Sequence, residues 1–173
     1  MIYNNKSVER KVNLAIRLLQ DKDYPLLVVN SSERSIAHRL AYYLENEFKG
    51  YNVDCEYNRN EQKPKMLMRR WGKNNKFRIK KDVYPDIIVH KRGNNENNLL
   101  VIEIKKTSNK SQKERDIDLL KLKAYMHKGD DYQYKYGMFI DFFVRGDFKK
   151  PPTKKFFKDF REINFVSKYF CKI

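Results

Sequence analysis

Apolar residues recur at helical spacing in the first third of the chain. Over residues 6–21 they mark one face of a helix that carries Val8, Val12, Ala15, Ile16 and Leu19. Tyr24 and Pro25 stop this helix, because the residue before a proline is disfavoured in the helical conformation. Asn and Ser residues that can cap a helix then precede a second amphipathic stretch, residues 32–48. The pattern therefore predicts two helices, each with one buried face.

The hydrophobic period then changes to two residues, which is typical of strands. Residues 51–57 put three apolar side chains on one side of the chain, Val53, Cys55 and Tyr57. Two further apolar runs, residues 83–90 and 98–105, are separated by the turn-like segment 92–95. These segments predict one strand followed by a hairpin.

Two more elements and a tail complete the chain. We predict a helix over residues 110–128 and a strand over residues 134–144. After a Pro-Pro break, residues 153–167 form either a last basic helix or an irregular packed tail. The order helix, strand, strand, strand, helix, strand predicts an α/β fold with a central mixed sheet flanked by helices. We expect the 173 residues to form a single domain, with a core over about residues 32–143 and a C-terminal basic tail at 145–173.

Charge adds a partner class to this picture. The chain has 38 Lys and Arg against 22 Asp and Glu, a formal net charge of +16, which favours binding to a polyanion such as nucleic acid. The longest aliphatic runs are far shorter than the roughly 20 residues of a membrane helix. No secretory signal opens the sequence, so we expect a cytoplasmic protein without a membrane partner. Two cysteines and three scattered histidines match no disulfide framework or classical zinc motif.

The segment between the first strand and the hairpin is strongly basic. Residues 58–81 contain ten basic residues and one acidic residue, with no sustained apolar period, so we interpret them as a long excursion from the core. We expect Arg69, Arg70 and Lys73 to bind phosphates. Trp71 beside them suits stacking on an unpaired base, and it suits anchoring the excursion to the core equally well.

Charged residues also interrupt the apolar hairpin. Asp86 follows Tyr84 and Pro85 at the start of its first strand, and Glu103-Ile104-Lys105 ends the second. Acid-x-Lys spacing occurs at four other places in this lysine-rich chain, but only here does it end a continuous aliphatic strand. Because side chains alternate along a strand, Glu103 and Lys105 share one face. Carboxylates placed in this way can hold Mg²⁺ or Mn²⁺, and a lysine can orient or deprotonate an attacking water.

These residues and the element order resemble the PD-(D/E)XK nuclease superfamily, the restriction-endonuclease-like phosphodiesterases. Segments 33–40 and 54–58 are similar to small uncharacterised prokaryotic members, a likeness that brings no substrate with it. The resemblance implies a restriction-endonuclease-like core in which Asp86 and Glu103 bind Mg²⁺ or Mn²⁺ and Lys105 serves the attacking water. It implies a hydrolase that cleaves phosphodiester bonds, of DNA rather than RNA.

Many members of this superfamily add an acidic residue from the helix before the first core strand. Glu33 is our candidate for this third metal ligand, because it projects near the centre of the apolar face of the second helix. Its alternative role is purely local, since an acidic residue in the first turn of a helix interacts favourably with the helix dipole. For Asp86 the alternative is a turn-forming aspartate, and for Glu103 and Lys105 it is a solvated ion pair.

The sequence leaves two function classes open. The first is a metal-dependent nuclease, and the second is a non-catalytic nucleic-acid-binding module on the same fold, against which the intact Asp86, Glu103 and Lys105 argue. Lys106 points away from the face that carries Lys105, so it either contacts a phosphate or is solvated. A homodimer, the strandedness of the substrate and any sequence specificity stay open.

Overall fold

A computed structural model describes residues 3–57, 59–60, 63–64, 66–67, 81–82, 84–127, 132–159 and 161–163, with the backbone alone for the four short segments between 59 and 82. Four α-helices lie in this part of the chain: α1 (Asn5–Lys22), α2 (Tyr24–Val28), α3 (Glu33–Glu47) and α4 (Gln112–Tyr125). None of the helices described is long and apolar enough to cross a membrane.

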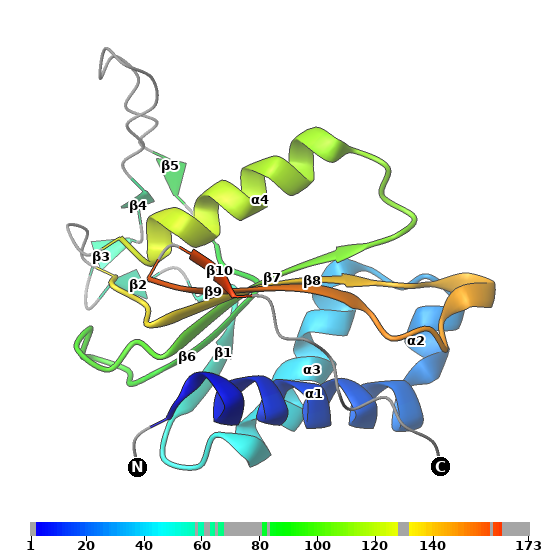
Figure 1. Cartoon of the computed structure of the whole chain (residues 1–173), viewed down its shortest axis with the longest axis horizontal. Coiled ribbons are helices and arrows are strands. Elements are labelled where there is room, and N and C mark those ends of the chain that lie inside the picture. Colours follow the sequence, from blue (N-terminus) through cyan, green and yellow to red (C-terminus); the bar gives the residue numbers. More distant parts are fainter. Residues whose placement is uncertain are drawn as a thin grey trace.

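A mixed sheet of six strands forms the centre of the fold (Figure 1). Its strands, in spatial order, are β1 (Asn52–Cys55), β6 (Ile87–His90), β7 (Leu100–Lys106), β8 (Tyr136–Phe142), β9 (Thr153–Lys158) and β10 (Arg161–Ile163). Only β7 and β8 run parallel, and α4 is the crossover that joins them, as parallel neighbours require. The predicted α/β fold, with a mixed sheet flanked by helices, is confirmed.

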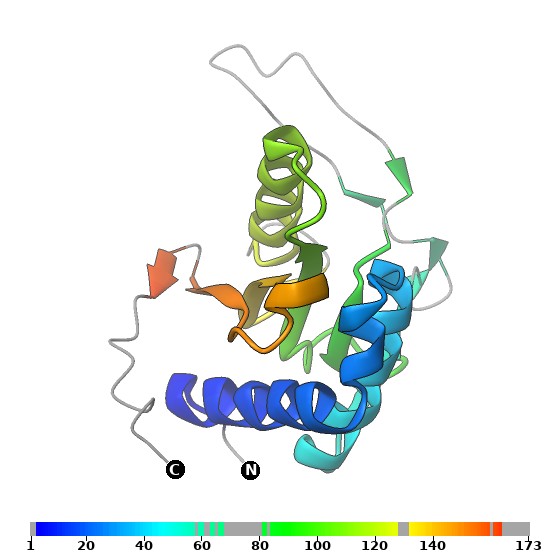
Figure 2. The same cartoon turned by 90° about the vertical axis from the view of Figure 1, so that its right-hand side faces the viewer.

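Both faces of the sheet are covered, but unequally. Helices α1, α2 and α3 pack on one face and build the larger core with alternate residues of β7: Leu100, Ile102 and Ile104. Helix α4 covers the other face with a smaller cluster that contains Val101, Leu122 and Tyr125. Figures 1 and 2 show α1 and α4 on opposite sides of the sheet. Whatever polar groups β7 turns toward α4 are therefore enclosed between that helix and the strand.

The bounds of the predicted helices agree with the structure to within a few residues. The Ser32 side chain accepts a hydrogen bond from the Ser35 backbone N–H at 3.1 Å and so caps α3. Pro25 ends the first helix, but the aliphatic run after it forms the short helix α2, with this proline in its first turn. The predicted hairpin is the antiparallel pair β6 and β7, in which Ile88 lies opposite Val101.

Short strands also occur in the basic excursion. β2 (Arg59–Asn60) pairs with β3 (Lys63–Pro64), and β4 (Met66–Leu67) pairs with β5 (Lys81–Asp82). The hairpin expected near residues 72–75 lies outside the described residues.

Two local predictions are wrong. Tyr57 does not share a side with Val53 and Cys55: it packs on the α4 cluster, because Glu56 takes a left-handed φ of 47° and the chain leaves strand geometry there. Residues 153–158 are a strand rather than a helix or irregular tail. β9 pairs antiparallel with β8, with Phe156 opposite Met138, and so covers a strand that would otherwise present unpaired backbone groups. The 3₁₀ helix η1 (Arg145–Asp147) makes the turn between these two strands.

The close approach of α4 to β8 yields a stability prediction. A Cβ added at Gly137 would lie 2.7 Å from Met126 Sδ, whereas one added at Gly146 meets nothing within 4 Å. We expect Gly137→Ala to lower the free energy of unfolding by roughly 1 to 3 kcal/mol because of overpacking. The control Gly146→Ala should stay within about 0.5 kcal/mol of wild type. Urea denaturation of both variants measures the difference, and equal stabilities would contradict this packing.

Candidate active site

The pairing of β6 with β7 brings the two predicted carboxylates to one place. Ile87 lies opposite Ile102, and the same register continued by one residue sets Asp86 opposite Glu103. Asp86 Oδ2 accepts a hydrogen bond from the Ile104 backbone N–H at 2.6 Å, which holds this carboxylate against β7. Glu103 points toward α4, as the alternation along β7 predicts, and its side chain is only 1% exposed.

Two lysines and two further acids join these carboxylates. Lys105 Nζ lies 2.6 Å from Asp118 Oδ2 and 3.3 Å from Glu33 Oε2. Lys121 Nζ lies 2.7 Å from Asp118 Oδ1 and 3.6 Å from Glu103 Oε2. Acids and bases thus alternate in one connected series, which we call the charge chain: Glu33, Lys105, Asp118, Lys121 and Glu103.

The charge chain is assembled from three elements. Glu33 stands in the first turn of α3, where the cap formed by Ser32 fixes the start of the helix. Asp118 and Lys121 are three residues apart on α4 and therefore on one face of it. The remaining members come from β7, so the chain ties the helices on both sides of the sheet to its central strands.

Burial shifts the pKa of both carboxyls beside β7 upward. Desolvation raises the pKa of Asp86 to about 6, although the Ile104 hydrogen bond and Lys105 oppose the shift. Desolvation also raises the pKa of Glu103 well above its usual range, and repulsion by Asp86 adds to the effect. The two carboxylates therefore lie close enough to destabilise one another when both are ionised.

The lysines remain ammonium ions in this setting. Burial by itself lowers the pKa of Lys105, but its contacts with Asp118 and Glu33 outweigh this and raise it. Burial by itself likewise lowers the pKa of Lys121, but its contacts with Glu103 and Asp118 outweigh this and raise it. With every group ionised, the charge chain and Asp86 together carry four negative and two positive charges. The excess of two negative charges equals the charge of one divalent cation.

The donor types fit a hard cation, but the side chains do not surround one. Carboxylate oxygens are the ligands that Mg²⁺ and Mn²⁺ prefer. Yet in the described part of the chain no three His, Cys, Asp or Glu side chains are grouped so that they could hold a metal ion. The two ammonium groups bridge the acids instead. Glu103 Oε2 is the oxygen nearest Lys121, whereas Glu103 Oε1 has no hydrogen-bond partner among the residues described.

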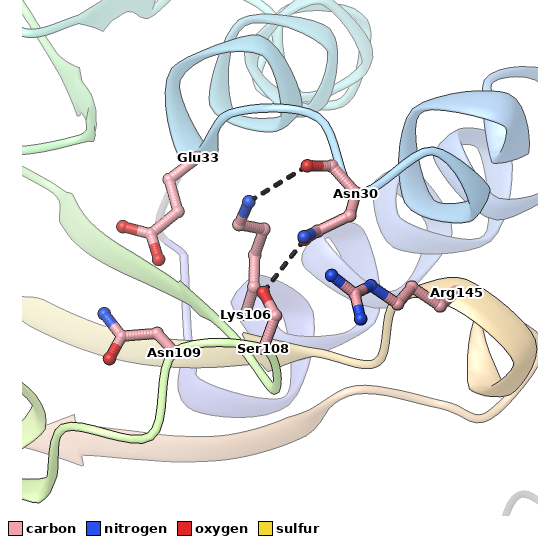
Figure 3. Close-up of a pocket in the computed structure, with 6 residues that line it drawn as sticks. All are labelled: Asn30, Glu33, Lys106, Ser108, Asn109 and Arg145. Carbon is pink, nitrogen blue, oxygen red and sulfur yellow. Dashed lines mark hydrogen bonds between the residues drawn. The ribbon is translucent and has the colours of Figure 1, made fainter.

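Two cavities adjoin the site, one at Glu33 of the charge chain and one at Asp86. The first, of about 410 Å³, opens beside Glu33 and is lined by residues from the loops before α3 and after β7, the start of α3, the end of β7 and η1: Asn30, Glu33, Lys106, Ser108, Asn109 and Arg145 (Figure 3). The second, of about 200 Å³, adjoins Asp86 and is lined by Arg34, Ala37, His38, Cys55, Glu56 and Asp86. The buried charges therefore have access to solvent from two directions.

The other predicted site residues have different outcomes. Lys106 turns away from Lys105, as expected, and is partly exposed where it lines the first cavity. It donates to the backbone carbonyls of Asn30 at 3.3 Å and Ser31 at 2.6 Å, and so holds the loop that precedes α3. Arg69, Arg70, Trp71 and Lys73 lie outside the described residues.

Sequence reasoning missed Asp118 and Lys121. The signal was available in part, because Asp118 lies four residues before Leu122 and seven before Tyr125, which places an acid on the buried face of α4. The apolar residues of this helix fall on two opposed sides, so the pattern alone did not show which side meets the sheet.

Comparison of the chain with known protein families, with curated proteins and with solved structures finds no match in any of the three.

The strained carboxyl of Asp86 yields a prediction on stability in the absence of metal. Its pKa is about 6 in the folded protein against 3.8 for an ordinary aspartate, so the stabilisation from the bound proton is complete below about pH 4 and is lost as the pH rises through 6. Asp86→Asn removes the ionisable group, so this loss of stability at high pH disappears. The amide oxygen can still accept the hydrogen bond from the Ile104 backbone N–H. In EDTA the variant should be more stable than wild type by roughly 1 to 3 kcal/mol at pH 7.5, and nearly equal at pH 4.

Chemical denaturation at the two pH values measures this difference. The control is Asp21→Asn, which makes the same chemical change at an exposed position of α1 and should give no such gain. If Asp86→Asn destabilises the protein at both pH values, the carboxylate is a structural group and is not held under electrostatic strain.

Proposed function

We propose that this chain is a metal-dependent nuclease with a restriction-endonuclease-like core, whose active site is formed by Asp86 and Glu103 with the rest of the charge chain. One observation carries the proposal: two buried carboxyls with raised pKa values lie against the central strand, beside a lysine held as an ammonium ion, in a cluster of four acids and two lysines. A purely structural ion-pair network gains nothing from such an excess, since buried charges without partners are costly. The net charge of +16 favours a nucleic acid as the substrate.

The residues that would hold the cation are Asp86 and Glu103, with Glu33 as a third oxygen donor. When bound, Mg²⁺ or Mn²⁺ supplies charge stabilisation at the scissile phosphate and lowers the pKa of the attacking water. Binding there requires Lys121 to release Glu103, and Asp118, which already contacts Lys121 at 2.7 Å, remains to receive it. The exchange keeps every ammonium paired.

Lys105 has a narrower role than its residue type allows. Because Asp118 and Glu33 raise its pKa, Lys105 is protonated at neutral pH and cannot accept the proton of the attacking water in this arrangement. It acts as a fixed positive charge that donates hydrogen bonds to the water and to the phosphate oxygen on which negative charge develops. Asp118 positions its ammonium.

The rival function is a nucleic-acid-binding module without turnover, and one observation favours it. The lysines already neutralise part of the acidic cluster, and no three potential ligands are grouped as a metal site in the part of the chain described here. If the charge chain is only a structural network, then the basic surface alone carries the function, and binding needs no divalent cation.

Cleavage assays separate the two functions. Linear, circular, branched and single-stranded DNA, and RNA, are incubated with the protein in Mg²⁺, Mn²⁺ or EDTA. We expect metal-dependent cleavage that Glu103→Gln abolishes. Lys105→Ala should slow cleavage by roughly 10²- to 10⁴-fold with nucleic-acid binding retained, because this residue supports the reaction and is not a metal ligand.

Matched controls use the same substitutions at exposed positions. Glu162→Gln on β10 and Lys123→Ala on α4 should leave the cleavage rate unchanged, and circular dichroism checks that all four variants fold. A protein that binds DNA or RNA but cleaves neither in any of the metals contradicts the nuclease proposal and supports the binding module.

A further inference from the structure

We propose that the cavity beside Glu33 binds one backbone phosphate of the nucleic-acid strand, next to the phosphate that is cleaved, and that Arg145 is the side chain that holds it. This inference rests on the proposed function, because it takes the charge chain as the place where the scissile phosphate lies. It adds a residue and a subsite that no motif in the sequence indicates.

The cavity is continuous with the charge chain through a single residue. Glu33 lines the cavity, and its Oε2 atom lies 3.3 Å from Lys105 Nζ (Figure 3). A strand whose scissile phosphate meets Lys105 therefore extends into this space on the Glu33 side. The volume of about 410 Å³ is large enough for a phosphate group and its sugar.

Most polar groups around the cavity are already engaged. Lys106 is bound to two backbone carbonyls, and Ser108 Oγ donates to Asn30 Oδ1 at 2.9 Å. Asn109 Nδ2 donates to Glu114 Oε2 at 2.7 Å, while Asn109 Oδ1 accepts from the Ser111 backbone N–H at 2.9 Å. These side chains shape the walls but have little bonding capacity left for a ligand.

Arg145 differs from these neighbours. It is exposed, and its guanidinium has no hydrogen bond or ion pair with any residue that the structure describes. Figure 3 shows it extending from η1 toward the side of the cavity formed by Asn30 and Ser108. A planar guanidinium with free N–H groups matches the oxygens of a phosphate, which it can bind through two parallel hydrogen bonds.

The backbone beneath the cavity is also unusual. Arg145 has a φ of 64° and Asn30 a φ of 56°, so two of its lining residues adopt the left-handed conformation. Asparagine tolerates this conformation well, but for arginine it is sterically unfavourable. The next residue is Gly146, which could take a strained position without that cost, yet the arginine occupies it. The arrangement aims the guanidinium into the cavity at the expense of local strain.

Charge decides which kind of phosphate fits. The walls of the cavity carry two positive charges, on Arg145 and Lys106, and one negative charge, on Glu33. An internal phosphodiester carries one negative charge, which the net charge of these walls balances. A terminal phosphate monoester carries about 1.5 to 2 negative charges at neutral pH and would be repelled by Glu33. The ligand is therefore an internal phosphate of the strand rather than its end.

Equilibrium binding in EDTA tests the subsite without any cleavage. The probe is a fluorescein-labelled single-stranded DNA of 16 nucleotides, and its anisotropy is recorded over a range of salt concentrations. Arg145→Ala should weaken binding about 3- to 10-fold and reduce the slope of log K against log salt by about 0.7, which is the loss of one phosphate contact to a single strand. Arg145→Lys should restore the slope, because it keeps the charge, but only part of the affinity.

Arg10→Ala is the matched control. Its neighbour Lys11 donates to the carbonyl of Glu47, which places Arg10 near the end of α3 opposite to Glu33, roughly 20 Å away along a helix of 15 residues. This exposed arginine should leave the slope unchanged. If Arg145→Ala also leaves affinity and slope unchanged, or if both arginines change them equally, the subsite does not exist.

Backbone neutralisation identifies the phosphate. A set of probes carries one uncharged methylphosphonate at successive internal positions, and another set lacks the terminal phosphates. A methylphosphonate at one internal position should weaken DNA binding by the wild-type protein. The same probe should cause no further loss of binding by Arg145→Ala. If removal of a terminal phosphate produces this pattern instead, the cavity binds a strand end and the inference is wrong.

The outcome is separable from that of the proposed function. If Arg145 contributes one phosphate contact but the protein cleaves nothing in Mg²⁺ or Mn²⁺, the result supports the subsite and contradicts the nuclease proposal. If the protein cleaves DNA and Arg145→Ala matches wild type in affinity, salt slope and cleavage rate, the result supports the nuclease proposal and contradicts the subsite.

Discussion

The charge chain is the interaction on which the rest of this structure depends. Glu103 is buried on the central strand β7, where an unpaired carboxylate would be very costly, and its counter-charge comes from Lys121 on α4. Asp118 pairs with both lysines, and Lys105 extends the contacts to Glu33 at the start of α3. The charge chain thus links the helices on the two faces of the sheet to β7, beside the two apolar clusters that pack them there.

The same arrangement carries a cost that its function would explain. Two carboxylates with raised pKa values lie side by side, and the lysines compensate only part of the charge. Natural proteins commonly retain such strain where a ligand or a reaction needs it. Here a divalent cation would supply the missing charge. The left-handed backbone at Arg145, beside the first cavity, and at Glu56, beside the second, places further local strain around this region.

Local periodicity was enough to predict the faces of β7 but not their partners. Alternation alone placed Glu103 and Lys105 on one face, and helical spacing brought Glu33 into consideration. Asp118 was missed because its role depends on which side of α4 meets the sheet, a tertiary choice that a helix with apolar residues on two sides does not reveal. Tyr57 was misplaced because one left-handed residue reverses the alternation, and β9 was missed because its conformation depends on the neighbouring strand β8.

A crystal of the metal-free protein soaked in Mn²⁺ tests the central claim most directly, through the anomalous scattering of manganese. The account predicts one strong peak within about 2.0 to 2.6 Å of carboxylate oxygens from both Asp86 and Glu103, with the Lys121 ammonium moved from Glu103 toward Asp118. Manganese found only elsewhere, with Lys121 still beside Glu103 and the charge chain intact, would show that these acids form a structural network and not a catalytic metal site.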